Sequence, residues 1–112
     1  DAAFVVRQDG SNPIAEFRGN SGAIKVSMLT NGNVGLGTST FGTSAAGVLA
    51  LFNGTEPSTS PADTLQIFSV DLSAGNATLG LRTETAIAVE SVASTRTLSV
   101  RINGETRKIL LA

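Results

Sequence analysis

The stretch TRTLSVRINGETRKILL, residues 95–111, alternates apolar and polar side chains before an Asn-Gly pair. Successive side chains of an extended chain point to opposite sides, so the apolar set shares one face. That set is Leu98, Val100 and Ile102. Asn103 and Gly104, which follow, both tolerate the positive φ of a tight hairpin turn. The stretch therefore predicts a half-buried strand, a turn and a final apolar strand.

The same pattern recurs along most of the 112 residues. Apolar runs at 2–8, 14–18 and 22–29 each end at a turn dipeptide. These dipeptides are Asp9-Gly10, Gly19-Asn20 and Asn31-Gly32. No window of about eleven residues repeats apolar side chains at three-and-four spacing, as an amphipathic helix would. We therefore predict an all-β fold of roughly nine strands with little or no helix.

Composition excludes several classes of function. The chain has no His and no Cys, which removes Ser-His-Asp and Cys-His nucleophile systems and thiolate metal sites. Its net charge is −1 and Lys and Arg form no run, so we expect no nucleic-acid partner. The longest apolar runs, such as 45–52, are too short to span a bilayer, so we expect no membrane insertion. A surface with many Ser and Thr is typical of an extracellular or particle-borne structural protein.

Two segments carry apolar side chains on both faces. In residues 64–72, Ile67 points one way, whereas Phe68 and Val70 point the other. Residues 84–92 behave similarly. A single sheet in a chain of this length cannot cover both faces of such strands, so we predict association between chains.

Small and turn-forming residues divide the chain. Residues 37–47 are rich in Gly, Ser, Thr and Ala, and we expect them to link an N-terminal β-rich segment, 1–44, to a C-terminal β domain, 45–112. Residues 53–63 hold two of the three prolines and predict a long surface loop. Because the chain begins at Asp1 without an initiator methionine, we expect a cleaved or truncated product.

The segment TNGNVGLGTST, residues 30–40, holds three closely spaced glycines, which are Gly32, Gly35 and Gly37. A phosphate loop would need Gly-Lys before Ser or Thr, and a dinucleotide fingerprint would need G-x-G-x-x-G before a helix. Neither pattern is present, so we predict no cofactor. Instead, Asn31-Gly32 predicts a hairpin turn, and the other two glycines leave one face of a strand bare. We expect a neighbouring chain to approach that face closely.

Acidic residues leave an enzymatic alternative open. Glycoside cleavage needs two carboxylates across a sugar-sized gap, and the candidates are Asp63, Asp71, Glu84 and Glu90. The last two could share one face of a strand. However, the chain lacks the Tyr and Trp platforms on which carbohydrate clefts usually rely. We therefore predict a protein that is not an enzyme and has no catalytic, cofactor-binding or metal-binding residues.

Several segments together resemble one family. DGSNPIAEFRGNSG (9–22) and LTNGNVGLGTST (29–40) are similar to the Asp/Asn-Pro-x-x-x-Phe and Gly-Asn-Val-Gly-(Ile/Leu)-Gly-Thr segments of bacteriophage tail fibres and tailspikes. FNGTEPSTSPADTLQIFSVDLSAGNATLGLRTE (52–84) and ASTRTLSVRINGETRKILLA (93–112) resemble the distal region and C-terminus of such fibres. The chain departs from the family in showing no self-cleaving chaperone domain and no polysaccharide-degrading domain. It also carries Arg107-Lys108 where relatives often have aromatic residues.

The resemblance implies an elongated, intertwined homotrimer of β-helix, β-prism or small sandwich-like elements, carried on a virion as an extracellular tail appendage. Its role would be mechanical support and presentation of a host-recognition surface to a cell-surface glycan or protein receptor. Two alternatives stay open. One is a trimeric stalk or adhesin segment of a bacterial surface protein, and the other is a fragment of a polysaccharide-cleaving tailspike.

The residues expected to matter fall into two groups. Those expected to set the backbone path, the terminal hairpin and the interchain core are Gly32, Gly35, Gly37, Leu98, Val100, Ile102, Asn103, Gly104, Ile109 and Leu111. Loops on a rigid scaffold usually carry binding. Those expected to contact a receptor are therefore Glu56, Ser58, Thr59, Ser60, Asp63, Ser73 and Asn76.

Overall fold

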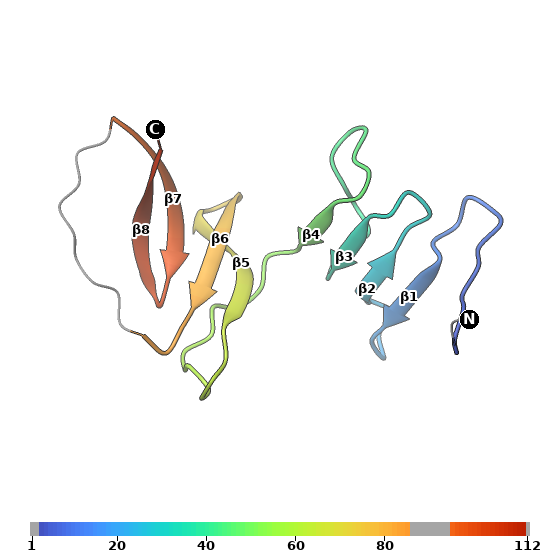
Figure 1. Cartoon of the computed structure of the whole chain (residues 1–112), viewed down its shortest axis with the longest axis horizontal. Helices are drawn as coiled ribbons and strands as arrows, with labels where there is room; N and C mark the ends of the chain where they lie inside the picture. Colours follow the sequence, from blue (N-terminus) through green and yellow to red (C-terminus); the bar gives the residue numbers. More distant parts are fainter. Residues whose placement is uncertain (1–2, 86–94, 112) are drawn as a thin grey trace. The chain divides into compact units, whose positions relative to one another are not determined.

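The computed structural model describes residues 3–85 and 95–111 of the chain (Figure 1). These residues form eight β-strands and no helix, which confirms the all-β prediction. The chain divides into two compact units, Asp1–Phe52 and Asn53–Ala112, and each unit is built on one four-stranded sheet. The strand predicted at 84–92 falls mostly outside the described residues.

The first unit contains four short strands in the order β1-β2-β3-β4. They are β1 (Ala15–Arg18), β2 (Ile24–Met28), β3 (Val34–Leu36) and β4 (Leu49–Leu51). The β1–β2 and β2–β3 pairs are antiparallel, whereas β3 and β4 are parallel. A parallel pair needs a crossover connection rather than a tight turn, and residues 37–48 provide it.

The second unit has longer strands in the order β5-β6-β7-β8. They are β5 (Gln66–Ser73), β6 (Asn76–Arg82), β7 (Arg96–Ile102) and β8 (Glu105–Leu111). Two antiparallel hairpins, β5–β6 and β7–β8, are joined by a short parallel pairing of β6 with β7. The terminal hairpin forms where it was predicted. Its turn has a φ of 50° at Asn103 and 83° at Gly104, the left-handed conformation that these two residues tolerate best.

Two sequence-based expectations differ from the structure. The run at 2–8 was expected to be a strand, but residues 3–8 form none, because the adjacent edge strand β1 pairs only with β2. Strand propensity does not make a strand unless a neighbour pairs with its backbone. The boundary between the two units falls between Phe52 and Asn53 in the sequence, whereas we expected it between residues 44 and 45. Pairing of β4 with β3 places 45–52 in the first unit.

An asparagine side chain fastens the crossover of the first unit. Asn33 is only 1% exposed, and its Oδ1 accepts a hydrogen bond from the Val48 N–H at 2.9 Å. Its Nδ2 donates to the Ala45 carbonyl at 3.1 Å. These bonds replace strand pairing at the point where the crossover returns to β3, so β4 begins in register with its neighbour.

Replacing Asn33 by Ala is expected to destabilise the first unit by about 1–2 kcal/mol, because the Val48 N–H and the Ala45 carbonyl lose their part-buried hydrogen-bond partner. Chemical denaturation at fixed protein concentration measures the shift. Asn20→Ala, in the exposed β1–β2 turn, is the matched control and should change stability by less than about 0.5 kcal/mol. Equal effects of the two substitutions would contradict the role given to Asn33.

The described residues hold almost no apolar core of their own. Val100 is the single buried hydrophobic side chain among them, while 17 large hydrophobic side chains are exposed. A fold normally rests on a connected cluster of buried apolar side chains, each worth about 1.5–3 kcal/mol. Among residues 3–85 and 95–111, burial of apolar side chains therefore falls well short of what their apolar content could provide.

Candidate functional site

The predicted recognition loop, residues 53–63, is tied to the second sheet rather than hanging free. At its start, the Gly54 N–H donates to the Ser69 carbonyl at 3.1 Å, and the Ser69 hydroxyl donates to the Asn53 Oδ1 at 2.7 Å. Farther along, Ser60 donates its hydroxyl to the Thr83 carbonyl at 2.9 Å. The loop therefore follows the sheet with a fixed backbone.

Two arginines fix the middle of this loop. The Arg101 Nε donates to the Glu56 Oε2 at 3.0 Å, and the Arg82 guanidinium donates to the Pro57 carbonyl. The ion pair is about one-quarter exposed, so we assign it little net stability, but it sets where the loop lies. Sequence reasoning missed both arginines. The available signal was that Arg82 is the only charged side chain of β6.

Hydrogen bonds between backbone and side-chain groups hold the end of the loop. The Asp63 N–H donates to the Glu84 Oε2 at 2.8 Å, and Gln66 donates its Nε2 to the Thr59 carbonyl at 3.0 Å. Glu56 and Ser60, expected to contact a receptor, are thus half-buried and engaged in holding the loop. The side chains of Ser58, Thr59 and Asp63 face solvent.

The second predicted contact segment, the β5–β6 turn, lies elsewhere on the sheet. Ser73 and Asn76 are both exposed, and the Asn76 Nδ2 donates to the Ser73 hydroxyl at 3.0 Å. Strand β5 pairs with Arg82 at its first residue and with Asn76 at its last. Seven steps along a strand span about 23 Å. The end of the loop, at Ser60 and Asp63, therefore lies at the opposite end of the hairpin from the β5–β6 turn, whereas the loop begins near that turn, where the Asn53 side chain bonds Asp71.

The acidic candidates for glycoside cleavage have other partners. Glu84 accepts the Asp63 N–H, as described above. Asp71 accepts bonds from the Asn53 side chain and, at 3.3 Å, from the Gly75 N–H at the turn end of the hairpin. Glu90 lies outside the described residues. The bond at Asp63 brings two of the candidates, Asp63 and Glu84, close together, whereas Asp71 lies toward the turn end of the hairpin. Among residues 3–85 and 95–111 no cluster of three metal-ligating side chains occurs.

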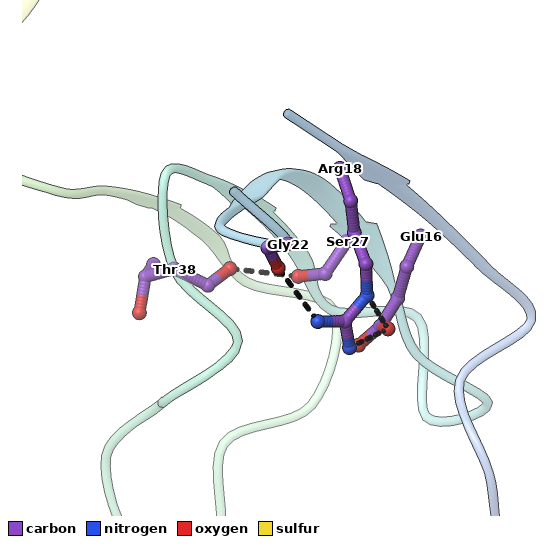
Figure 2. Close-up of polar contacts among 5 residues, drawn as sticks. All are labelled: Glu16, Arg18, Gly22, Ser27 and Thr38. Carbon is purple, nitrogen blue, oxygen red and sulfur yellow. Dashed lines mark hydrogen bonds and ion pairs between the residues drawn. The ribbon is translucent and has the colours of Figure 1, made fainter. Parts of the chain in front are cut away.

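The glycine-rich segment makes a close approach within the chain. Figure 2 shows the Ser27 hydroxyl donating to the Thr38 carbonyl, at 2.7 Å, while Arg18 bonds Glu16 and the Gly22 carbonyl at the end of the β1–β2 hairpin. A Cβ added to Gly35 would lie only 2.0 Å from the Thr38 oxygen. The bare strand face is therefore real at Gly35, but the backbone that covers it belongs to the same chain.

Gly37 has a different role from the one expected. Strand β3 ends at Leu36, so Gly37 does not continue the bare face. Its φ is 77°, and an added Cβ would lie 3.1 Å from the Phe52 Cβ. It turns the chain out of the strand and into the crossover. Gly32, by contrast, closes the expected β2–β3 turn, where its N–H donates to the Leu29 carbonyl at 3.0 Å.

The predicted interchain residues share one face of the second sheet. Cross-strand partners lie on the same face. Leu98 pairs with Ile109 and Arg96 with Leu111, so the set Leu98, Val100, Ile102, Ile109 and Leu111 is on one side. Pairing of Leu81 with Ile102 and Ile67 extends this side across β6 and β5. Of the expected set, Val100 is buried, Ile102 is half-buried and the other three are exposed.

No protein-family model matches this chain, and no curated protein and no solved structure was found to be similar to it. The described segments include no helix long and apolar enough to cross a bilayer.

Proposed function

We propose that this chain is a structural and host-recognition module of a phage tail fibre, which acts as a homotrimer on the virion and outside the cell. It supports the appendage and presents a loop to a glycan or protein receptor of the host. It performs no catalysis and engages neither nucleic acid nor membrane. The observation that carries the proposal is the exposure of apolar side chains on both sheets, with a single one buried among the described residues.

This exposure supports the proposed association between chains. Monomeric proteins seldom expose apolar patches larger than a few hundred Å². Here Leu98, Ile109 and Leu111 stand together on one sheet face at 41–50% exposure, and Ile67 continues the same face at 58%. Burial of these side chains between identical chains supplies a core that the described residues of one chain do not form. In a closed cyclic trimer, every copy buries the same apolar side chains.

The recognition role rests on the fixed loop at residues 53–63. Hydroxyl and carboxylate groups at Ser58, Thr59 and Asp63 are exposed, and such groups form hydrogen bonds with sugars and with peptide backbones. The Glu56–Arg101 ion pair and the bond from Arg82 to Pro57 hold the backbone beneath them. A loop held in one conformation loses less entropy on binding.

Light scattering at low micromolar concentration should give a mass of about three chains of 11.4 kDa. A stable monomer would exclude the proposal. For recognition, labelled protein is applied to a panel of bacterial strains, and Thr59→Arg is compared with Thr43→Arg, an exposed position in the first unit. Loss of at least about tenfold in cell binding with Thr59→Arg alone supports the loop. Equal loss with both variants rejects it.

The alternative, a stalk or adhesin segment of a bacterial surface protein, would also be trimeric. Genome neighbourhood separates the two, because tail and baseplate genes belong beside only the phage protein. Host polysaccharide that is unchanged after incubation with the protein would eliminate the tailspike alternative.

A further inference from the structure

Three Asn-Gly pairs occur in the chain, at 31–32, 53–54 and 103–104. Such pairs are open to deamidation, because glycine carries no side chain to shield its backbone nitrogen. In this reaction the glycine nitrogen bonds to the asparagine Cγ, the Cγ–Nδ2 bond breaks, and ammonia leaves with the glycine proton. Water from the solvent then opens the cyclic imide to aspartate or isoaspartate. The fate of each pair in the folded chain therefore depends on how its side-chain amide and its glycine N–H are held.

The pair at 53–54, which begins the predicted recognition loop, is held by strand β5. The Asn53 Oδ1 accepts the Ser69 hydroxyl at 2.7 Å, and the Asn53 Nδ2 donates to the Asp71 carboxylate. The Gly54 N–H donates to the Ser69 carbonyl at 3.1 Å. We refer to these three bonds as the first anchor of the loop. Deamidation removes both the Gly54 proton and the Asn53 Nδ2 group, so it needs the anchor to open.

The partner of the amide nitrogen distinguishes this pair from the other two. The Asn31 Nδ2 donates to the Ala45 carbonyl at 3.1 Å, and the Asn103 Nδ2 donates to the Thr83 hydroxyl at 3.0 Å. These acceptors are neutral groups, whereas the acceptor at Asn53 is a carboxylate. Asn53 and Gly54 are also exposed, so solvent water reaches them once the anchor opens. A second carboxylate formed at position 53 would face that of Asp71.

We propose that Asn53-Gly54 is a deamidation site whose reaction releases the start of the recognition loop. The product carboxylate cannot donate a hydrogen bond to Asp71 and carries the same charge, so the two groups repel each other. Isoaspartate also adds a methylene group to the backbone, which displaces the Gly54 N–H from the Ser69 carbonyl. Neither product re-forms the first anchor. The inference deepens the proposed function by assigning a regulation to the recognition loop, and its effect on cell binding rests on that function.

Timed incubation of the native protein, followed by peptide mapping with mass spectrometry, measures deamidation at all three pairs in one sample. The pair at 53–54 should react at least about tenfold faster in denaturant than in the native protein. Ser69→Ala should raise its native rate about threefold or more, because one bond of the anchor is lost. Equal rates in the native and denatured protein, or an unchanged rate in Ser69→Ala, would overturn the proposal.

Two controls accompany the rate measurement. Ser73→Ala removes an exposed hydroxyl of the same strand that bonds Asn76 instead, and it should leave the rate at 53–54 unchanged. The pair at 103–104 lies in the same unit as Asn53, and its rate in Ser69→Ala should equal that in the parent protein. Acceleration at both pairs would mean that the substitution loosens the whole sheet, which would contradict the specific role of Ser69.

A charge exchange tests the release of the loop. Asn53→Asp reproduces the product charge, and amide hydrogen exchange in residues 54–60 should become about fivefold faster or more. Adding Asp71→Asn supplies an amide donor opposite the new carboxylate, so the double variant should recover the protection of the parent. Parent-like exchange in Asn53→Asp alone, or no recovery in the double variant, would show that repulsion from Asp71 does not release the loop.

Cell binding separates this inference from the proposed function. A released loop loses more entropy on binding, so Asn53→Asp should bind a recognised bacterial strain about tenfold more weakly than the parent, and Asp71→Asn should restore binding. Equal binding by Asn53→Asp and the parent would overturn the regulation and leave recognition intact. A parent protein that binds no strain would overturn the recognition role, whereas the deamidation rates and the exchange data would still decide whether position 53 is a modification site.

Discussion

Gly35→Val is expected to abolish the first sheet rather than only to loosen contacts between chains. A Cβ at this position would lie 2.0 Å from the Thr38 oxygen, 3.0 Å from the Thr38 carbonyl carbon and 2.9 Å from the Ser27 Oγ. Two of these atoms are backbone, so no rotamer change relieves the clash. Overpacking costs about 1–3 kcal/mol and occasionally more, and the valine methyl groups add to the Cβ. We expect a loss of more than about 3 kcal/mol.

Amide hydrogen exchange by mass spectrometry measures the result separately for residues 15–51 and 66–82. Protection should disappear from the first range and remain in the second. Gly42→Val is the matched control, since an added Cβ there meets nothing within 4 Å and its φ is not positive. It should leave protection unchanged.

The same substitution distinguishes crowding within a chain from crowding between chains. If valine at position 35 acted only at an interface, it would be harmless in a chain that does not associate. In a solution dilute enough for the chains to dissociate, the clash with Thr38 persists. Loss of exchange protection under that condition supports crowding within the chain, and normal protection there would reject it.

The hairpins could be predicted because their signals are local. Asn103-Gly104 needs only its own backbone conformation to reverse the chain, and alternation in 98–102 then fixes which side chains share a face. The same reasoning gave the β2–β3 turn at Gly32. The all-β fold and the shared face of the C-terminal residues follow from signals of this kind.

The parallel pairings could not be predicted, because they depend on contacts between distant residues. β4 joins β3 through a crossover that the Asn33 side chain holds from 12 and 15 residues away. β7 joins β6 beside Asn103, whose Oδ1 accepts the Thr83 N–H at 2.7 Å across 20 residues. No dipeptide or periodicity encodes such bonds. The expected domain boundary consequently fell inside the crossover, which looks like a linker when read by composition alone.

The candidate site was predicted in outline and not in detail. The loop at 53–63 was predicted from its prolines, but its anchors, Arg82 and Arg101, lie outside the loop, on β6 and β7. Glu56 reads as an exposed loop carboxylate in the sequence, whereas it is a half-buried partner of Arg101. Turn chemistry therefore locates a loop, while the side chains that fix it come from elsewhere in the chain.

Gly80→Val is expected to destabilise the second sheet by about 2–4 kcal/mol, because Gly80 faces an aromatic ring. Phe68 is its cross-strand partner, and an added Cβ would lie 2.1 Å from the Phe68 Cε2. The ring covers the bare backbone of Gly80, which is buried in consequence. A side chain at position 80 must expel the ring toward solvent and leave its apolar surface exposed.

Because the obstacle at Gly80 is a side chain, the loss should be recoverable, unlike that at Gly35. In a double-mutant cycle, Phe68→Ala alone should cost about 1–3 kcal/mol, and in its presence Gly80→Val should cost at least about 1.5 kcal/mol less than in the parent protein. Chemical denaturation at fixed protein concentration provides the four free energies. Gly54→Val, where an added Cβ meets nothing within 4 Å, is the control and should show no coupling with Phe68. Additive effects of Gly80→Val and Phe68→Ala would mean that the ring does not lie over Gly80 in solution.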